Sequence, residues 1–421
     1  MRVGRPGEPL MRARERTADR RVTAAGLWAA GGFLLLSIAS AALPSQVRMG
    51  AWLPLHLALA GAASQAIGAA LPFFTASLLA GRPARWELRA AVLVLLGAGA
   101  LAVSGGFAGH VPPLAAAGGA SFIAGIGLLA LTAFLPLRRA MGSRHPWVLV
   151  AYGVALADVA IGAALGSFEV GGFGPVQADW AWLKPMHAWL NLLGFVSLVV
   201  AGTLLHLYPT VVGSRISGGI RMRVMVVGLA LGAPLVALAY LARSDMIGLA
   251  GAAIEIAGAV GLVAYVAGAW RVRGRWTGDL SWRTVAIGSL GSGVAWFAIA
   301  VAAVAGRVLL QGATPGAWSL SVVGAPLAAG WIAQSLVGSW THLLPAISGG
   351  SPRRHARQRG ILGIAAVPRI IAMNGGVALL AVGLAMSIPA PMEAGAVLVA
   401  GTLLIGLGLL LAATLAREPG R

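Results

Sequence analysis

Apolar stretches recur from one end of this 421-residue chain to the other, and they constrain its fold more than any other feature. A run of about 20 apolar residues matches the length of a helix that crosses the hydrocarbon core of a bilayer. Hydrophobic residues make up 58% of the chain and charged residues only 10%, unlike ordinary soluble domains. Strands of a membrane barrel would alternate polar and apolar residues, and these stretches do not. The sequence therefore predicts an all-α integral membrane protein.

Twelve transmembrane helices are expected, near residues 22–42, 52–80, 88–108, 113–136, 147–167, 187–210, 223–242, 247–269, 284–305, 317–346, 367–388 and 393–415. With the N-terminus placed inside, 27 of the 31 Lys and Arg residues fall in inside segments. The other four are Arg48, Lys184, Arg243 and Arg307. This bias favours a plasma-membrane protein with both termini in the cytoplasm.

One domain, residues 22–415, is expected between a basic cytoplasmic tail at 1–21 and a short tail at 416–421. The alternative is that the first span is a cleaved signal peptide, since "SIASAALPS" offers small residues near a cleavage site. Eleven spans would then remain, in the same orientation.

The net charge of +19 does not indicate nucleic-acid binding here, because the arginines lie in short loops between apolar spans. The chain contains no cysteine. That excludes disulfides, iron–sulfur clusters, thiolate-ligated haem and covalently attached c-type haem.

Spans 2, 6 and 10 resemble one another. They end "SQAIGAALPFF", "VVAGTLLHLYPT" and "AQSLVGSWTHLLPAI", and the pattern G-x-x-x-H-L-x-P occurs at 202–209 and again at 338–345. Similar helices four spans apart predict three four-helix units in a pseudo-threefold arrangement, whereas many transporters contain two-fold repeats. The alternative is that Gly- and Ala-rich helices resemble each other without a repeat.

Four histidines lie on these three helices and are the candidate cofactor ligands: His56, His187, His206 and His342. The predicted topology puts His56 and His187 at the outer level and His206 and His342 at the inner level. His187 and His206 are roughly 28 Å apart along a helix, so one metal ion cannot bind both.

Imidazole is the usual axial ligand of a b-type haem, and two facing helices can each supply one ligand at the same depth. His56 with His187, and His206 with His342, meet that depth requirement. A histidine at the end of a span can instead bind a loop carbonyl or face lipid headgroups.

Asp158 in span 5 and Glu255 in span 8 are the acidic residues deep inside spans. A buried carboxyl there is a candidate proton relay, or it is a protonated group bonded to a neighbouring helix. The amides Gln65, Asn191, Gln334 and Asn374 are expected to form hydrogen bonds between helices. Gln65 and Gln334 take similar places in the repeat and are both expected near the bundle axis.

The chain resembles subunit I of haem–copper oxidases and their divergent relatives, including NnrS-type membrane proteins. The segment "MHAWLNLLGFVSLVVAGTLLHLYPT" is similar to the H-x-H-x-N-L-L-G segment of actinobacterial members, some of which are associated with copper nitrite reductase or multicopper oxidase domains. "WLPLHLALAGAASQAIGAALPFFTASL" and the run 330–350 resemble their second and tenth spans. The resemblance implies haem ligands at His56 and His187.

The chain also departs from the oxidase pattern. Span 6 lacks the Glu and Tyr of the copper motif, span 7 contains no histidine, and the histidine of span 10 is at its inner end. A copper-binding triad is therefore not expected, and neither is reduction of oxygen or nitric oxide at a haem–copper centre.

The functional hypothesis is a haem-binding membrane protein that acts in electron transfer or in handling nitric oxide or copper, as in denitrification. A copper nitrite reductase or multicopper oxidase is its expected redox partner. The alternatives are a proton-coupled secondary transporter, in which Asp158 or Glu255 carries the proton, and a structural or assembly protein.

Overall fold

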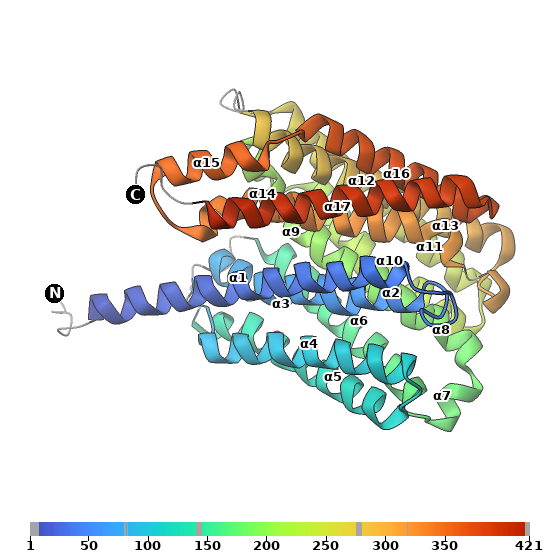
Figure 1. Cartoon of the computed structure of the whole chain (residues 1–421). Coiled ribbons are helices and arrows are strands. Elements are labelled where there is room, and N and C mark those ends of the chain that lie inside the picture. Colours follow the sequence, from blue (N-terminus) through green and yellow to red (C-terminus); the bar gives the residue numbers. More distant parts are fainter. Residues whose placement is uncertain are drawn as a thin grey trace.

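The computed structural model describes residues 8–79, 81, 83–139, 145–274, 280–317 and 319–416. Within them it contains twelve helices long and apolar enough to cross a membrane, as the sequence predicts. The ends of both expected tails, residues 1–7 and 417–421, lie outside the described residues. Both termini are at the same end of the bundle (Figure 1), as an even number of spans requires.

The first four spans form one unit, drawn blue to teal in Figure 1. Its first helix, α1, begins at Glu8. Most of the predicted N-terminal tail is therefore helical and continuous with the apolar run of span 1. The elements are α1 (Glu8–Ala41), α2 (Trp52–His56), η1 (Leu57–Ala63), α3 (Ser64–Leu78), α4 (Trp86–Ala108), α5 (Pro112–Phe134) and η2 (Leu135–Arg139).

The middle four spans form the second unit, drawn green to yellow. The segment 168–186 between spans 5 and 6 is largely helical, and span 6 begins at Trp180 rather than near residue 187. The elements are α6 (Pro146–Val170), α7 (Gly174–Ala178), α8 (Trp180–Trp189), η3 (Leu190–Ser197), α9 (Leu198–Val212), α10 (Ile220–Ala242) and α11 (Asp245–Arg271).

The last four spans form the third unit, drawn yellow to red. A short basic helix, α15, occupies the connection between spans 10 and 11. The elements are α12 (Leu280–Gln311), η5 (Pro315–Ala317), α13 (Leu320–Gly324), η6 (Ala325–Ala333), α14 (Gln334–Ser348), α15 (Pro352–Leu362), α16 (Ala366–Met386) and α17 (Pro389–Leu415).

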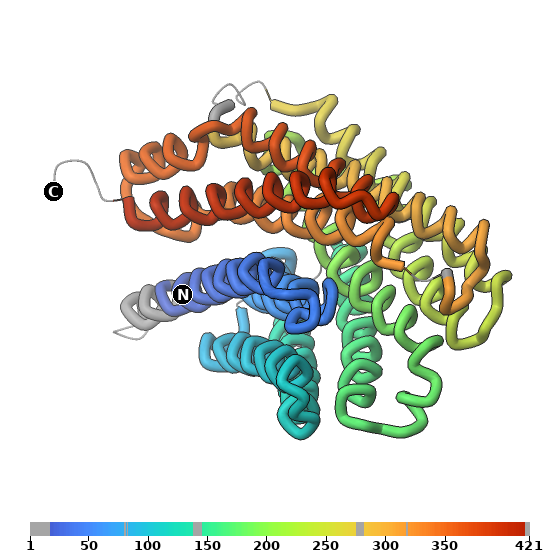
Figure 2. The backbone as a smooth tube through the Cα atoms, turned by 45° about the vertical axis from the view of Figure 1, so that its right-hand side comes forward, coloured from blue at the N-terminus to red at the C-terminus, as the bar shows by residue number. Residues whose placement is uncertain are grey.

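The third and fourth spans of every unit pack as a close antiparallel hairpin: α4 with α5, α10 with α11 and α16 with α17. Figure 2 shows the α16–α17 pair side by side in red. Glycines permit this approach, because a Cβ at Gly99 would lie 2.7 Å from the backbone nitrogen of Phe122, and one at Gly258 would lie 2.6 Å from that of Leu229. Small residues are the usual means by which membrane helices approach closely.

The second span of every unit contains a stretch of π-helix: η1, η3 and η6. Spans 2 and 6 are the two most buried of the twelve, and span 10 is as buried as span 7. The indole nitrogen of Trp331 in η6 donates a hydrogen bond to Ser197 Oγ in η3 at 3.0 Å, which joins spans 6 and 10 at the centre. The repeated π segments and repeated hairpins give the all-α fold its three four-helix units, as the pattern of spans 2, 6 and 10 predicts.

Replacing Gly258 by Val is expected to lower stability by about 3 kcal/mol, because the added side chain would push α11 away from the backbone of α10. Gly401→Val is the matched control, since Gly401 is also inside a membrane helix but nothing lies within 4 Å of a Cβ there. The midpoints of denaturant unfolding in detergent measure the difference. Equal midpoints for the two variants would show that the hairpin is not closely packed.

Candidate functional site

The candidate site is a cavity of about 570 Å³ at the end of the bundle where spans 2 and 6 begin, between spans 2, 3, 4, 5 and 6. Its size is in the range of pockets that bind cofactors and other small molecules. The walls are mostly apolar, and the polar groups include Ser167, Glu169, Lys184 and Asn191. His56 and His187 both line it.

The rings of His56 and His187 face each other across this cavity. Their centroids are 6.4 Å apart and their planes differ by 11°. His56 ends α2 immediately before the π segment η1, and His187 lies on α8 shortly before the π segment η3. The two units therefore present a histidine from corresponding parts of their second spans.

Each ring is held by a hydrogen bond from Nδ1 to a backbone carbonyl. Nδ1 of His56 donates to the oxygen of Trp52 at 2.9 Å, and Nδ1 of His187 donates to the oxygen of Gly162 at 2.7 Å. A carbonyl oxygen can only accept, so both rings carry their proton on Nδ1 when neutral. Nε2 is then the unprotonated nitrogen of both residues, which is the state that binds a metal ion.

Further contacts fix the two rings. The indole of Trp52 stacks on His56 with centroids 3.9 Å apart, and Phe107 packs on the same indole at 4.4 Å. Trp180 lies 5.8 Å from His187. Asn191 donates to the backbone oxygen of His187 at 2.6 Å. Sequence reasoning missed Trp52, although its position four residues before His56 on a helix is a detectable signal.

The pair fits a haem iron held from both sides. With metal–nitrogen bonds of about 2.0 Å, two imidazoles on one metal ion have centroids about 6 Å apart. The observed separation of 6.4 Å, the nearly parallel planes and the Nδ1–H bonds agree with that arrangement. The apolar walls suit a porphyrin, and Lys184 lines the cavity with a charge that suits a propionate.

Gly166 leaves room for the ring of His187. A Cβ at Gly166 would lie 2.7 Å from Cε1 of His187 and 3.0 Å from Nδ1. Gly166→Val is therefore expected to rotate His187 away from Gly162 and lower haem affinity by about 10- to 100-fold, as loss of a ligand-orienting contact does. Haem titration of the apoprotein measures this. The control is Gly127→Val, where nothing lies within 4 Å of a Cβ; equal affinities would contradict the geometry.

The rings of His206 and His342 do not face each other as the rings of His56 and His187 do. The ring of His206 contacts Phe74, with centroids 4.9 Å apart, and His342 stacks on Trp282 at 5.8 Å. Among the described residues, no ring contact or hydrogen bond links the two histidines. The second, inner ligand pair stays a prediction without a geometric observation to support it.

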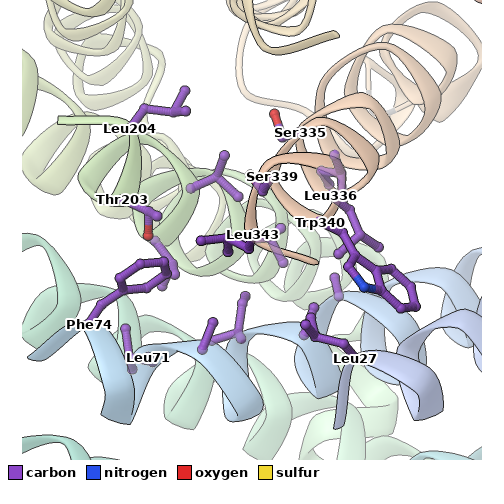
Figure 3. A pocket seen from close by; sticks show the side chains of 18 residues that line it. Leu27, Leu71, Phe74, Thr203, Leu204, Ser335, Leu336, Ser339, Trp340 and Leu343 are labelled. Atoms are coloured by element: carbon purple, nitrogen blue, oxygen red, sulfur yellow. The ribbon is translucent and has the colours of Figure 1, made fainter. Parts of the chain in front are cut away.

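A smaller apolar cavity of about 90 Å³ lies between spans 1, 2, 6 and 10. Figure 3 shows Leu71 and Phe74 on one side of it and Ser339 and Leu343 on another. None of its 18 lining residues is a histidine. The cavity is too small for a porphyrin and does not extend the candidate site.

Asp158 and Glu255 are almost completely buried, at 4% and 1% exposure, and lie close enough to interact electrostatically. The carboxyl of Asp158 lies against Gly194 in η3, and that of Glu255 lies against Gly232 in α10. Neither forms an ion pair with a described residue, and Oδ2 of Asp158 has no hydrogen-bond partner there.

Gln65, Gln334 and Asn374 connect neighbouring helices as predicted, whereas Asn191 bonds to His187 on its own span. Gln65 donates to the carbonyl of Leu93 on α4 at 2.7 Å. Gln334 accepts from Ser292 of α12 at 2.8 Å and donates to Asn374 of α16 at 3.3 Å. Both glutamines are buried, at 1% and 2% exposure, and their spans meet at the centre of the bundle.

In the described part of the chain, no set of three or more His, Cys, Asp or Glu side chains is placed to hold a metal ion. Two imidazoles are enough for a haem site, because a porphyrin supplies the other four ligands of its iron.

No family model and no curated protein matches the sequence. Among solved structures, the chain is similar to one described as the cryo-EM structure of a heme-copper terminal oxidase dimer. The TM-score is 0.68 at 12% sequence identity, over 95% of this chain and 85% of that chain. At that identity the likeness concerns the fold. The chain is thus a multi-pass membrane protein with a fold like that of haem–copper oxidase subunit I.

Proposed function

We propose that the protein binds one b-type haem between His56 and His187 and acts in electron transfer. The observation that carries the proposal is the facing pair of imidazoles, each with Nδ1 donating to a backbone carbonyl and with centroids 6.4 Å apart. Trp52 and Gly162 supply those carbonyls and so keep Nε2 of both rings available. The walls of the cavity are mostly apolar, which suits the faces of a porphyrin.

A haem with imidazole on both faces supplies one-electron chemistry and has no open coordination position for oxygen or nitric oxide. This is why we propose electron transfer rather than catalysis by a terminal oxidase. Span 7 contains no histidine, and His342 lies at the inner end of span 10. Both features support a site without a copper centre.

The proposed setting is the plasma membrane, with both termini in the cytoplasm. The basic residues support this orientation, since 27 of the 31 fall in the tails and the segments between spans that are expected on the inside. We further propose that the protein is a divergent NnrS-like member of the group. Its electrons would then be exchanged with a copper nitrite reductase or multicopper oxidase in nitric oxide or copper handling.

The direct test is the absorbance spectrum of protein purified after haem-replete expression. The expected result is one haem per chain by the pyridine haemochrome assay, with the sharp α and β bands of a low-spin haem after reduction. Protein that is folded and monodisperse but has no Soret band, even after haem is added, would rule the proposal out.

A proton-coupled transporter is the second candidate, favoured by the buried carboxyls of Asp158 and Glu255. In that case, Asp158→Asn should abolish proton-driven uptake into liposomes while the protein remains folded. Haem binding that is unaffected by Asp158→Asn, together with no uptake by the unmodified protein, would exclude this alternative.

A further inference from the structure

A cluster of hydrogen-bond donors lies at the inner end of the bundle, where α12 begins and α14 and α15 meet. Trp282, only 4% exposed, stacks on His342 with ring planes 14° apart. The guanidinium carbon of Arg359 on α15 lies 5.3 Å from the centre of the Trp282 ring. Arg283 lies 5.4 Å from the same ring and adds positive charge to this region.

Three buried nitrogens of this cluster, one each from Trp282, Arg359 and His342, lack a partner among the described residues. They are Nε1 of Trp282, Nε of Arg359 and Nδ1 of His342. Arg359 also forms no ion pair in that part of the chain. Buried donors are normally paired, and a partly buried guanidinium without a counter-charge is unfavourable. An acceptor with negative charge would satisfy these donors and neutralise the guanidinium.

The helix that supplies Arg359 is held firmly in place. Arg354 donates to the carbonyls of Thr414 and Ala416 at 3.2 and 3.1 Å, and Gln358 donates to that of Ala413 at 3.1 Å. These bonds fix α15 against the end of α17, so Arg359 does not depend on a flexible loop for its position. The sequence of α15, "PRRHARQRGIL", contains four arginines and no carboxylate that could neutralise them.

The depth of the cluster indicates the source of the acceptor. His342 is six residues before the end of α14, at the end of the bundle where both termini lie. Lipid headgroups are found at this level of a membrane, and basic pockets between helices on the cytoplasmic side bind anionic headgroups. We propose that Trp282, His342 and Arg359 bind the phosphate group of an anionic phospholipid. Inorganic phosphate has the same chemistry and is the other source that the test must separate.

The test is native mass spectrometry of delipidated protein in detergent, titrated with phosphatidylglycerol or with a neutral glycolipid that lacks phosphate. The unmodified protein should retain one phosphatidylglycerol and not the glycolipid. Arg359→Gln should weaken retention about fivefold, the usual effect of one basic residue near a membrane surface. Trp282→Phe, which keeps an aromatic ring but removes the N–H donor, should also weaken it. Arg353→Gln is the matched control, because Arg353 is exposed on the same helix.

Inorganic phosphate is then added as a competitor. Displacement of the lipid by millimolar phosphate, with weaker phosphate binding by Arg359→Gln, would support the same site with a soluble phosphate as its ligand. Equal retention of phosphatidylglycerol by the Arg359→Gln and Arg353→Gln proteins would overturn the proposal. Retention of the glycolipid as strongly as phosphatidylglycerol would overturn the proposal as well.

Discussion

Replacing His56 or His187 by Ala is expected to abolish the low-spin haem spectrum and to reduce the haem retained per chain to about a tenth or less. The two rings face each other at 6.4 Å, and neither has a neighbouring histidine that could replace it. Removing one imidazole leaves one face of the iron without a protein ligand. Haem content and the reduced α band of the purified variants measure the effect.

The controls for this result are His206→Ala and His342→Ala, which remove the inner histidines. Both variants should keep the full haem content and an unchanged spectrum, because their rings contact Phe74 and Trp282 and not the outer cavity. Loss of haem only from the inner variants would move the site to the other end of the bundle. Loss from all four would indicate that the variants fail to fold.

Asp19→Asn is expected to lower the free energy of unfolding by about 3 kcal/mol, the lower end of the range for a buried ion pair, because Arg89 is buried but Asp19 is 26% exposed. Arg89 is 1% exposed, and its guanidinium contacts Asp19 at 3.0 Å and Thr23 at 2.7 Å. Without the carboxylate, the charge of Arg89 is left buried between α1, α3 and α4. Denaturant unfolding in detergent measures the loss.

The matched control is Asp179→Asn, which removes a similar pair at the surface. Asp179 contacts Arg243 at 3.1 Å, but their side chains are 60% and 57% exposed. Such pairs contribute about 0–1 kcal/mol, so this variant should unfold almost like the unmodified protein. If the two variants lose the same stability, the Arg89–Asp19 pair is not the buried contact that joins span 1 to its unit.

The twelve spans could be predicted because the length and composition of each apolar run are set by the membrane and not by tertiary packing. The repeat could also be predicted, since spans 2, 6 and 10 share residues as well as spacing. The start of α1 could not be predicted, because its arginine-rich first turns lack the apolar signal but still form a helix. The π segments were not predicted either, as they depend on how the central helices pack.

Depth along a helix predicts the pairing of His56 with His187, and the structure places their rings 6.4 Å apart. Depth also predicts the pairing of His206 with His342, which stays a prediction. Which side of a helix faces which neighbour depends on packing, and the local π turns change that direction along spans 2, 6 and 10. The carbonyl of Gly162 and the space beside Gly166 belong to span 5, so the sequence of span 6 could not reveal them.

Electron paramagnetic resonance of the oxidised protein tests the central claim most directly, because it reports which ligands hold a ferric haem. The expected spectrum is that of one low-spin haem with two imidazole ligands, absent from both the His56→Ala and the His187→Ala proteins. A high-spin signal in the unmodified protein, or a bis-imidazole signal that persists without His56 and without His187, would contradict the assignment.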